Sequence, residues 1–309
     1  MLVVGELNVD LILDKLDKFP EVGKEVISRQ MLLTLGSSAA IFASNLSVLG
    51  SRVAFCGRVG RDNFADKIIA DLAGKGVQTR YIVRSDTADT GVTVALNVEE
   101  DRAMVTYPGA MNELSAADVT DDMLDDASHL HISSIFLQPG LRPGLESLVA
   151  RARQRGLTTS LDPQWDPAEK WDLPAEKLLP NINVFLPNLE ELKNITRQTS
   201  ADDGLNSIKE VANIVVVKQG SAGATLCQGD TLLRQAAFLN HEIADAIGAG
   251  DSFNAGFIHQ FIKGKALEEC MFFGALCGAI NTTRHGGTTA FADYAAVRQL
   301  AMQKFNILL

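Results

Sequence analysis

The chain has 309 residues, of which 46% are hydrophobic and 21% are charged, and its formal net charge is −10. This composition is ordinary for a globular protein, and the length is sufficient to bury a large core. The acidic balance argues against nucleic acid as a partner, because a phosphate backbone is repelled unless a local basic patch attracts it, and we find none. The four cysteines form no CxxC pair and no Cys/His cluster, so they do not indicate a zinc site.

The N-terminal segment is apolar but does not have the features of a targeting sequence. Residues 1–13 lack a basic segment and carry Glu6 and Asp10 inside the apolar run. This pattern fits neither a signal peptide nor a membrane-spanning helix, and free cysteines in apolar segments fit a reducing compartment. We therefore expect a cytoplasmic protein with no membrane partner.

Short apolar strands alternate with amphipathic helices along most of the chain. The predicted strands cover residues 2–5, 52–56, 129–133, 158–162, 183–186 and 214–218. The predicted helices cover residues 38–49, 64–74, 142–155, 188–194, 201–211, 250–263, 266–283 and 293–304. Strands separated by helices imply βαβ units and a mostly parallel sheet.

Two pairs of segments interrupt this alternation, because no helix separates their strands. Residues 9–15 pair with 25–34, and residues 91–98 pair with 102–107 across a predicted turn at 99–101. Such strands often form a small flap over a cleft, although they could also be edge strands of the main sheet. We expect a single domain over residues 1–309, with lid strands inserted at about 9–35 and 91–108.

The segment DAIGAGD, from Asp245 to Asp251, carries the strongest chemical signal because a helix is predicted to begin within it. Small residues at a helix start leave backbone N–H groups unobstructed, and these groups together with the helix dipole suit a phosphate. Asp251 would lie in the first turn. It could simply cap the helix, or it could accept a hydroxyl proton during phosphoryl transfer.

Two other phosphate-binding motifs are excluded by spacing. The sequence contains no GxxxxGK followed by Ser or Thr, as a P-loop requires. The dinucleotide motif GxGxxG fails because Phe253 occupies the position of the third glycine.

The segment DAIGAGDSFNAGF resembles the C-terminal signature of the ribokinase-like, or PfkB, carbohydrate kinases. Other motifs of that family are matched in the family's order by GELNVDLIL, LGSSAAIFASNLSVLG, GRVGRDNFA, PNLEE and KQGSAG. The resemblance covers essentially the whole chain. It implies a ribokinase-like three-layer α/β/α fold with a mostly parallel central sheet and a small β-strand lid.

The resemblance also implies roles for individual residues. Asp251 would be the catalytic base, and the backbone amides of Gly248, Ala249, Gly250 and Asp251 would bind the γ-phosphate of ATP. The remaining implied sites are Asn188 and Glu191 for Mg²⁺ through water, Lys218, Gly220 and Gly223 for the nucleotide, and Asn8, Asp10, Gly36 and Ser37 for the acceptor. Without the resemblance, the pair at 188 and 191 reads equally well as a helix cap, and the segment 218–223 as a plain turn.

Three positions depart from the usual family pattern. Ser37 replaces a glycine and Ile41 replaces an asparagine in the predicted acceptor pocket, whereas Ala246 replaces a threonine near the phosphate site. Potassium bound near Asp245 and Ile247, which the family suggests, is an open alternative.

We therefore expect a kinase that uses ATP and Mg²⁺ to phosphorylate a hydroxyl of a sugar or sugar acid. The alternatives are a kinase of the same fold acting on a nucleoside or vitamin-like alcohol, and a non-catalytic sugar or nucleotide sensor. The presence of Asp251 argues for catalysis, and the aromatic content of 6% gives little support to a nucleoside pocket. Relatives also suggest a homodimer formed through the lid.

Overall fold

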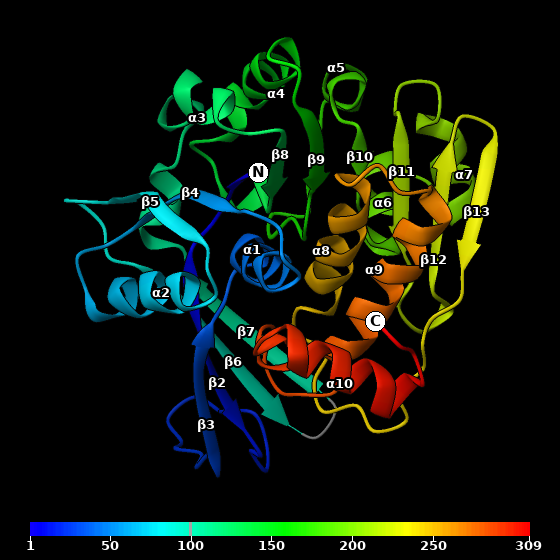
Figure 1. Cartoon of the computed structure of the whole chain (residues 1–309). Helices are drawn as coiled ribbons and strands as arrows, with labels where there is room; N and C mark the ends of the chain where they lie inside the picture. Colours follow the sequence, from blue (N-terminus) through cyan, green and yellow to red (C-terminus); the bar gives the residue numbers. More distant parts are fainter. Residues whose placement is uncertain (99–100) are drawn as a thin grey trace.

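The computed structural model describes residues 1–98 and 101–309, except for the side chain of Arg102. Within these residues, nine strands form a large sheet in the order β13-β12-β11-β10-β9-β8-β1-β4-β5 (Figure 1). All neighbours are parallel except β11 with β12 and β12 with β13. The strands are β1 (Leu2–Val4), β4 (Ala54–Val59), β5 (Gln78–Arg84), β8 (His129–Ser133), β9 (Thr158–Asp162), β10 (Val184–Phe185), β11 (Ile214–Lys218), β12 (Ala224–Gln228) and β13 (Thr231–Gln235).

Helices cover both faces of this sheet, which explains why central strands such as β8 and β9 are buried along nearly their whole length (Figure 1). Successive side chains of a strand point to opposite faces. Val216 packs into the cluster that contains α1, α2, α8 and α9, whereas Val215 and Val217 pack into the cluster that contains α4 to α7. The helices are α1 (Ser38–Val48), α2 (Asn63–Gly74), α3 (Asp121–Asp125), α4 (Leu145–Gln154), α5 (Ala175–Leu178), α6 (Leu189–Thr196), α7 (Ala201–Ile208), α8 (Ala249–Phe261), α9 (Leu267–Asn281) and α10 (Tyr294–Phe305).

A second sheet has the order β3-β2-β6-β7 and projects from one side of the large sheet (Figure 1). Its outer pairs are antiparallel and its central pair, β2 with β6, is parallel. The interpretation of these segments as edge strands of the main sheet is therefore wrong. The strands are β2 (Asn8–Asp14), β3 (Gln30–Leu35), β6 (Gly91–Val98) and β7 (Asp101–Tyr107).

The sequence predictions differ from the structure mainly at strands that bury few side chains. Residues 25–29 are not part of a strand, and the apolar residue Ile27 is 71% exposed rather than packed. Strands β5, β12 and β13 were not predicted. The edge strands β5 and β13 expose many residues and give a weak apolar pattern, whereas the mostly buried β12 has the mixed sequence ATLCQ. Residues 99 and 100 of the predicted turn lie outside the described residues. None of the described helices has both the length and the apolar character needed to cross a bilayer.

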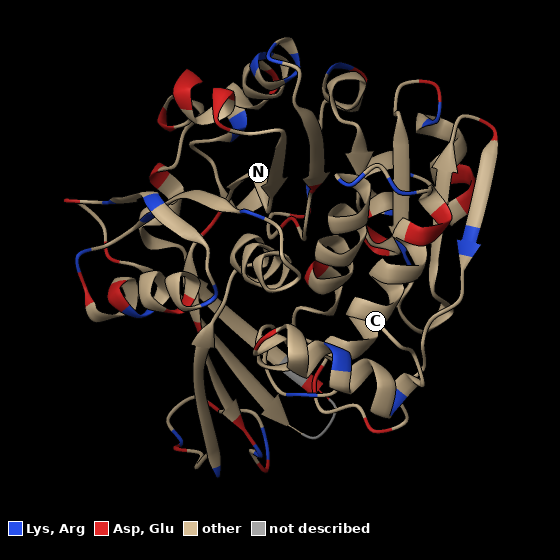
Figure 2. Ribbon diagram, in the orientation of Figure 1, with Lys and Arg blue, Asp and Glu red and all other residues tan. Residues whose placement is uncertain are grey.

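Helix α8 has an unusual charge distribution. Charged residues mostly lie on the outer helices and loops, whereas α1 contains none and α8 contains a single acidic residue, Asp251 (Figure 2). The two helices pack against each other near the carboxyl ends of β8, β9 and β11 (Figure 1). Asp251 is thus an isolated carboxylate at the start of an otherwise uncharged helix, at the edge where α/β folds usually bind ligands.

Candidate active site

The N-terminus of α8 has the backbone geometry of an anion-binding turn. Gly248 adopts φ +73°, and a Cβ atom there would lie 2.7 Å from the Cα atom of Gly287, so only glycine fits without displacing the backbone. No side chain caps the helix. In the described part of the chain, the N–H groups of Gly248, Gly250 and Asp251 have no protein acceptor, whereas that of Ala249 donates to the Ala246 carbonyl at 3.3 Å. Three of the four amides predicted to bind the phosphate are thus without a protein acceptor in the described residues, and their role stays a prediction.

A cavity of about 520 Å³ opens beside this turn. It brings together the residues predicted for the base, the phosphate, the nucleotide and magnesium. Its polar and glycine lining includes Gln164, Asn188, Glu191, Lys218, Gly220, Gly223, Gly248, Ala249, Gly250 and Asp251. Apolar walls are supplied by Phe238, Leu239, Ile243 and Phe253, among others. A cavity lined both by apolar side chains and by hydrogen-bond donors suits a ligand that carries a ring and phosphates.

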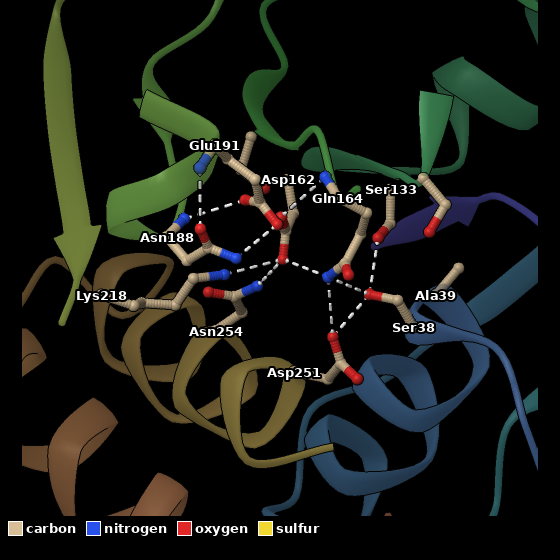
Figure 3. A network of polar contacts seen from close by, with 12 residues as sticks. Ser38, Ala39, Ser133, Asp162, Gln164, Asn188, Glu191, Lys218, Asp251 and Asn254 are labelled. Carbon is tan, nitrogen blue, oxygen red and sulfur yellow. Dashed lines mark hydrogen bonds and ion pairs between the residues drawn. The ribbon is translucent and has the colours of Figure 1, made fainter. Parts of the chain in front are cut away.

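Asp251 is 7% exposed, and its carboxylate belongs to a buried polar network (Figure 3). Its Oδ1 atom accepts hydrogen bonds from the Ser38 hydroxyl at 2.5 Å and from Nε2 of Gln164 at 3.1 Å. Burial and the nearby Asp162 raise the pKa of Asp251 to about 6, although these hydrogen bonds and the charge of Lys218 oppose the rise. A buried carboxylate of this kind is ionised at neutral pH and still basic enough to accept a proton.

The centre of the network is Asp162, a fully buried carboxylate at the end of β9. Its Oδ2 atom accepts from Lys218 Nζ at 2.9 Å, from Gln164 Nε2 at 2.9 Å and from the Asn254 amide (Figure 3). Burial lowers the pKa of Lys218, but the surrounding carboxylates, chiefly Asp162, outweigh burial and raise it overall. The Lys218 ammonium is therefore held in its charged form, and it lies 3.7 Å from where a Cβ atom of Gly250 would be.

Asn188 and Glu191 form a capping box at the start of α6, so the interpretation of this pair as a helix cap is confirmed. Asn188 Oδ1 accepts from the Glu191 N–H at 2.8 Å, and Glu191 accepts from the N–H and Nδ2 of Asn188 at 2.8 and 2.6 Å. Burial and Asp162 raise the pKa of Glu191 to about 8. Both side chains also line the cavity, and they carry the oxygen atoms that Mg²⁺ prefers, so the pair fits this ion as well as the cap.

The four predicted acceptor residues lie together where the second sheet meets α1. Ser37 donates to Asn8 Oδ1 at 2.5 Å and accepts from the Asn8 N–H at 2.7 Å, while Asn8 Nδ2 donates to Asp10 Oδ1 at 3.2 Å. Ser37 adopts φ +67°, a region that favours glycine, and its two hydrogen bonds with Asn8 compensate for that cost. A Cβ atom at Gly36 would lie 2.3 Å from Asp10 Oδ1, so glycine is needed for this close approach.

Ile41, which departs from the family pattern, lies next to the anion-binding turn of α8. It is buried and packs against the backbone at the mouth of α8, where Cβ atoms at Gly248 and Gly287 would meet its side chain at 3.1 and 2.4 Å. The departure from the family pattern at this position therefore affects the packing beneath the anion-binding turn.

The region predicted for potassium is closely tied by hydrogen bonds. Asp245 accepts from the N–H of Ile247 at 2.9 Å and from the N–H of Gly286 at 3.0 Å. The Ile247 carbonyl accepts from Asn281 Nδ2 at 2.5 Å. A potassium ion at this carbonyl would have to share it with the amide, and the site stays a prediction.

Four members of the network were not predicted from the sequence: Ser38, Asp162, Gln164 and Asn254. Two of them carried a usable signal. Asn254 follows Asp251 by three residues and so lies on the same face of α8, and Asp162 ends a parallel strand where ligands usually bind. Gln164 and Ser38 carried no such signal, because their contacts depend on how β9, α1 and α8 meet.

Comparison with known proteins identifies the family of the chain. The model of the pfkB family carbohydrate kinases matches residues 1–293. An uncharacterized sugar kinase from Archaeoglobus fulgidus is 29% identical over 243 residues, which cover 78% of this chain and 95% of that protein.

Solved structures share the fold. The structure of Arabidopsis thaliana ribokinase complexed with ribose and ATP has a TM-score of 0.84 at 23% identity, covering 97% of each chain. A ribokinase II from E. coli in complex with ATP and Mg²⁺ has a TM-score of 0.83 at 22% identity, covering 98% of each chain. The predicted ribokinase-like fold is thus confirmed, and the chain belongs to the pfkB family of carbohydrate kinases.

Proposed function

We propose that this protein transfers the γ-phosphoryl group of ATP to a hydroxyl of a sugar or sugar acid, with Asp251 as the general base. The observation that carries the proposal is the position of Asp251. It is a buried carboxylate in the first turn of a helix whose N–H groups at Gly248, Gly250 and Asp251 are without protein acceptors in the described residues. Membership of the carbohydrate kinase family supports the same assignment.

The residues of this chain suit an in-line transfer. The acceptor hydroxyl attacks the γ-phosphorus and gives its proton to Asp251, while the bond from phosphorus to the leaving oxygen of ADP breaks. The amides at the helix start, with the helix dipole, face the charge that develops on the phosphoryl oxygens. Lys218 adds a positive charge beside Gly250, and the buried Asp162 holds that ammonium in place.

ATP is the donor favoured by the shape and lining of the cavity, and ATP complexes are known for two structural neighbours. Asn188 and Glu191 would hold Mg²⁺ through water, since few protein groups suffice for this ion. When bound, Mg²⁺ neutralises phosphate charge. Lys218, Gly220 and Gly223 would border the nucleotide.

The magnesium assignment leads to a prediction about Glu191. Glu191→Gln prevents the side chain from ionising when Mg²⁺ binds but keeps an oxygen that can accept from Asn188, so the capping box is largely retained. We expect the Mg²⁺ concentration for half-maximal rate to rise about tenfold, with a change in Tm of only a few degrees. A Mg²⁺ titration of the rate, with a thermal melt as control, checks this. An unchanged Mg²⁺ requirement would show that Glu191 serves only as part of the helix cap and does not bind the ion.

We also propose that residues 1–309 form one domain and that the second sheet acts as a lid over the acceptor. Strand β2 supplies Asn8 and Asp10, and β3 leads directly into Gly36 and Ser37, so this sheet carries the predicted acceptor contacts. A lid that excludes water would limit hydrolysis of ATP.

The rate should depend on pH through Asp251. The base must be ionised, and its pKa is raised to about 6 by burial and by Asp162. We therefore expect kcat/KM to fall about tenfold per pH unit below about pH 6 and to be independent of this group above it. A pH profile measured with saturating ATP checks this expectation. An acidic limb near the ordinary pKa of an aspartate, about 4, would contradict the described surroundings of Asp251.

A coupled assay of ADP release over a panel of acceptors tests the proposed function. Ribose, fructose, ketodeoxygluconate and nucleosides, each with and without K⁺, separate the proposed class from nucleoside kinases and decide the potassium question. Turnover of a sugar or sugar acid supports the proposal. Turnover of nucleosides alone would replace it, and nucleotide binding without turnover of any acceptor would favour a sensor.

A further inference from the structure

The two carboxylate oxygens of Asp251 have different surroundings (Figure 3). Oδ1 accepts two hydrogen bonds, from Ser38 at 2.5 Å and from Gln164 at 3.1 Å. In the described part of the chain no hydrogen bond reaches Oδ2, while Asp251 itself lines the cavity. The side chain is therefore anchored through one oxygen, and the other is left for a ligand.

The conformation of Gln164 brings its side chain to the Asp251 carboxylate. It follows the end of β9 by two residues and adopts φ +59°, a conformation that few residues other than glycine accept. Its Nε2 atom lies 2.8 Å from Ser38 Oγ, 2.9 Å from Asp162 Oδ2 and 3.1 Å from Asp251 Oδ1. The two N–H groups of this amide thus lie within hydrogen-bonding distance of three oxygen atoms, which belong to α1, β9 and α8. Unusual backbone conformations of this kind persist where the surrounding structure holds them, often at functional sites.

We propose that Gln164 is a positioning residue that, together with Ser38, fixes Oδ1 of Asp251 and thereby selects Oδ2 as the oxygen that accepts the acceptor proton. This inference rests on the proposed function. In the step it describes, the O–H bond of the acceptor breaks and its proton moves to Oδ2, the new O–P bond forms, and the bond to ADP breaks. Gln164 does not touch the reacting atoms. It acts through the orientation of Asp251 and through the hydrogen bond that stabilises the charged form of Asp251.

The charged groups that face Asp251 make this hydrogen bond important. Asp162 on β9, Glu191 on α6 and Glu6, which follows β1, all favour a protonated Asp251, whereas Lys218 on β11 favours the charged form. The three carboxylates outweigh the single lysine. Each uncharged group that donates a hydrogen bond to Asp251 therefore helps to keep Asp251 ionised. Removing the donor at Gln164 should therefore raise the pKa of the base.

The test compares kcat/KM against pH for the wild type, Gln164→Leu and Gln164→Glu, using the acceptor found in the panel. Leu removes the donor at similar volume, and Glu keeps the shape but replaces the donor by a carboxylate. We expect Gln164→Leu to lower kcat by about 10- to 100-fold and to move the acidic limb up by about one pH unit. Gln164→Glu should move it further in the same direction. The KM for ATP should stay nearly constant.

Gln138→Leu is the matched control. Gln138 is a buried glutamine whose Nε2 donates to the Ser133 and Ser134 carbonyls, and no hydrogen bond joins it to Asp251 in the described residues. It should lower Tm without moving the acidic limb. If Gln164→Leu does not fold, Ser38→Ala, which removes the other donor to Oδ1, should give the same upward shift.

The outcomes separate this inference from the proposed function. A wild-type protein that phosphorylates no acceptor overturns the proposed function. An active wild type whose Gln164 variants keep its acidic limb and kcat overturns the positioning role and leaves the function standing. The positioning role is also overturned if Gln164→Leu loses activity only in proportion to its loss in Tm, as Gln138→Leu does, and the acidic limb of its pH profile stays where it is in the wild type.

Discussion

Asp251→Asn is expected to lower kcat by about 10³-fold while the KM for ATP stays nearly unchanged. Asparagine has almost the same shape and can still accept from Ser38 through its Oδ1 atom, so the local structure should persist. It cannot take up a proton from the acceptor. The amides proposed to bind the phosphate and the apolar walls of the cavity are untouched by the change. Steady-state rates, with ATP binding measured by calorimetry, check both parts of this expectation.

Asp293→Asn is the matched control for this variant. Asp293 is also an aspartate at a helix start, and its Oδ1 atom accepts from the Ala296 N–H at 2.8 Å at the N-cap of α10. Because asparagine caps helices about as well as aspartate, Asp293→Asn should change neither kcat nor Tm appreciably. If Asp251→Asn behaved in the same way, the role of Asp251 as the base would be wrong. The alternative that Asp251 caps the helix is already ruled out, because no side chain caps α8.

The second large effect is expected at Gly248. A methyl group at this position would require φ +73° from a residue that avoids it, and would meet the Cα atom of Gly287 at 2.7 Å and Ile41 at 3.1 Å. The turn must then shift, and with it the amides of Gly250 and Asp251. We expect Gly248→Ala to lower kcat by about 10²- to 10³-fold, since stabilisation by an anion hole depends on the placement of its donors.

Gly264→Ala is the matched control. It separates the effect of backbone strain at positive φ from the effect of displacing the amides at the start of α8. Gly264 has nearly the same φ, +71°, but a Cβ atom there meets nothing within 4 Å. It should therefore lose about 1 kcal/mol of stability from the backbone conformation alone and keep its kcat. Thermal melts and steady-state rates of the two variants make the comparison. Equal and unimpaired kcat values in both would show that the amides at the helix start contribute little to catalysis.

The main architecture could be predicted from the sequence because its signals are local. The apolar run at residues 214–217 indicates a sheet covered on both faces, and the spacing of apolar residues after Gly250 indicates a helix at that point. The antiparallel pair β12 and β13 gave no comparable signal, since β13 lies at the sheet edge and exposes residues such as Leu232. Local patterns reveal elements that bury a face, and they reveal little about elements that do not.

The sequence could predict those parts of the candidate site whose residues lie in one continuous segment. Gly248, Gly250 and Asp251 occur in one turn, so their proximity follows from the chain itself. The contact of Gln164 with Asp251 requires a left-handed residue after β9 and the packing of α8 against α1. No spacing of residues in the sequence predicts the contact between Gln164 and Asp251.

The proposed catalysis requires that the backbone at the start of α8 binds the phosphoryl group that is transferred. A crystal structure with Mg²⁺ and a non-hydrolysable ATP analogue tests this directly. We predict that the terminal phosphate lies within hydrogen-bonding distance, about 3 Å, of the N–H groups of Gly250 and Asp251. A terminal phosphate bound away from this turn, with those two groups left in contact with solvent, would contradict the account.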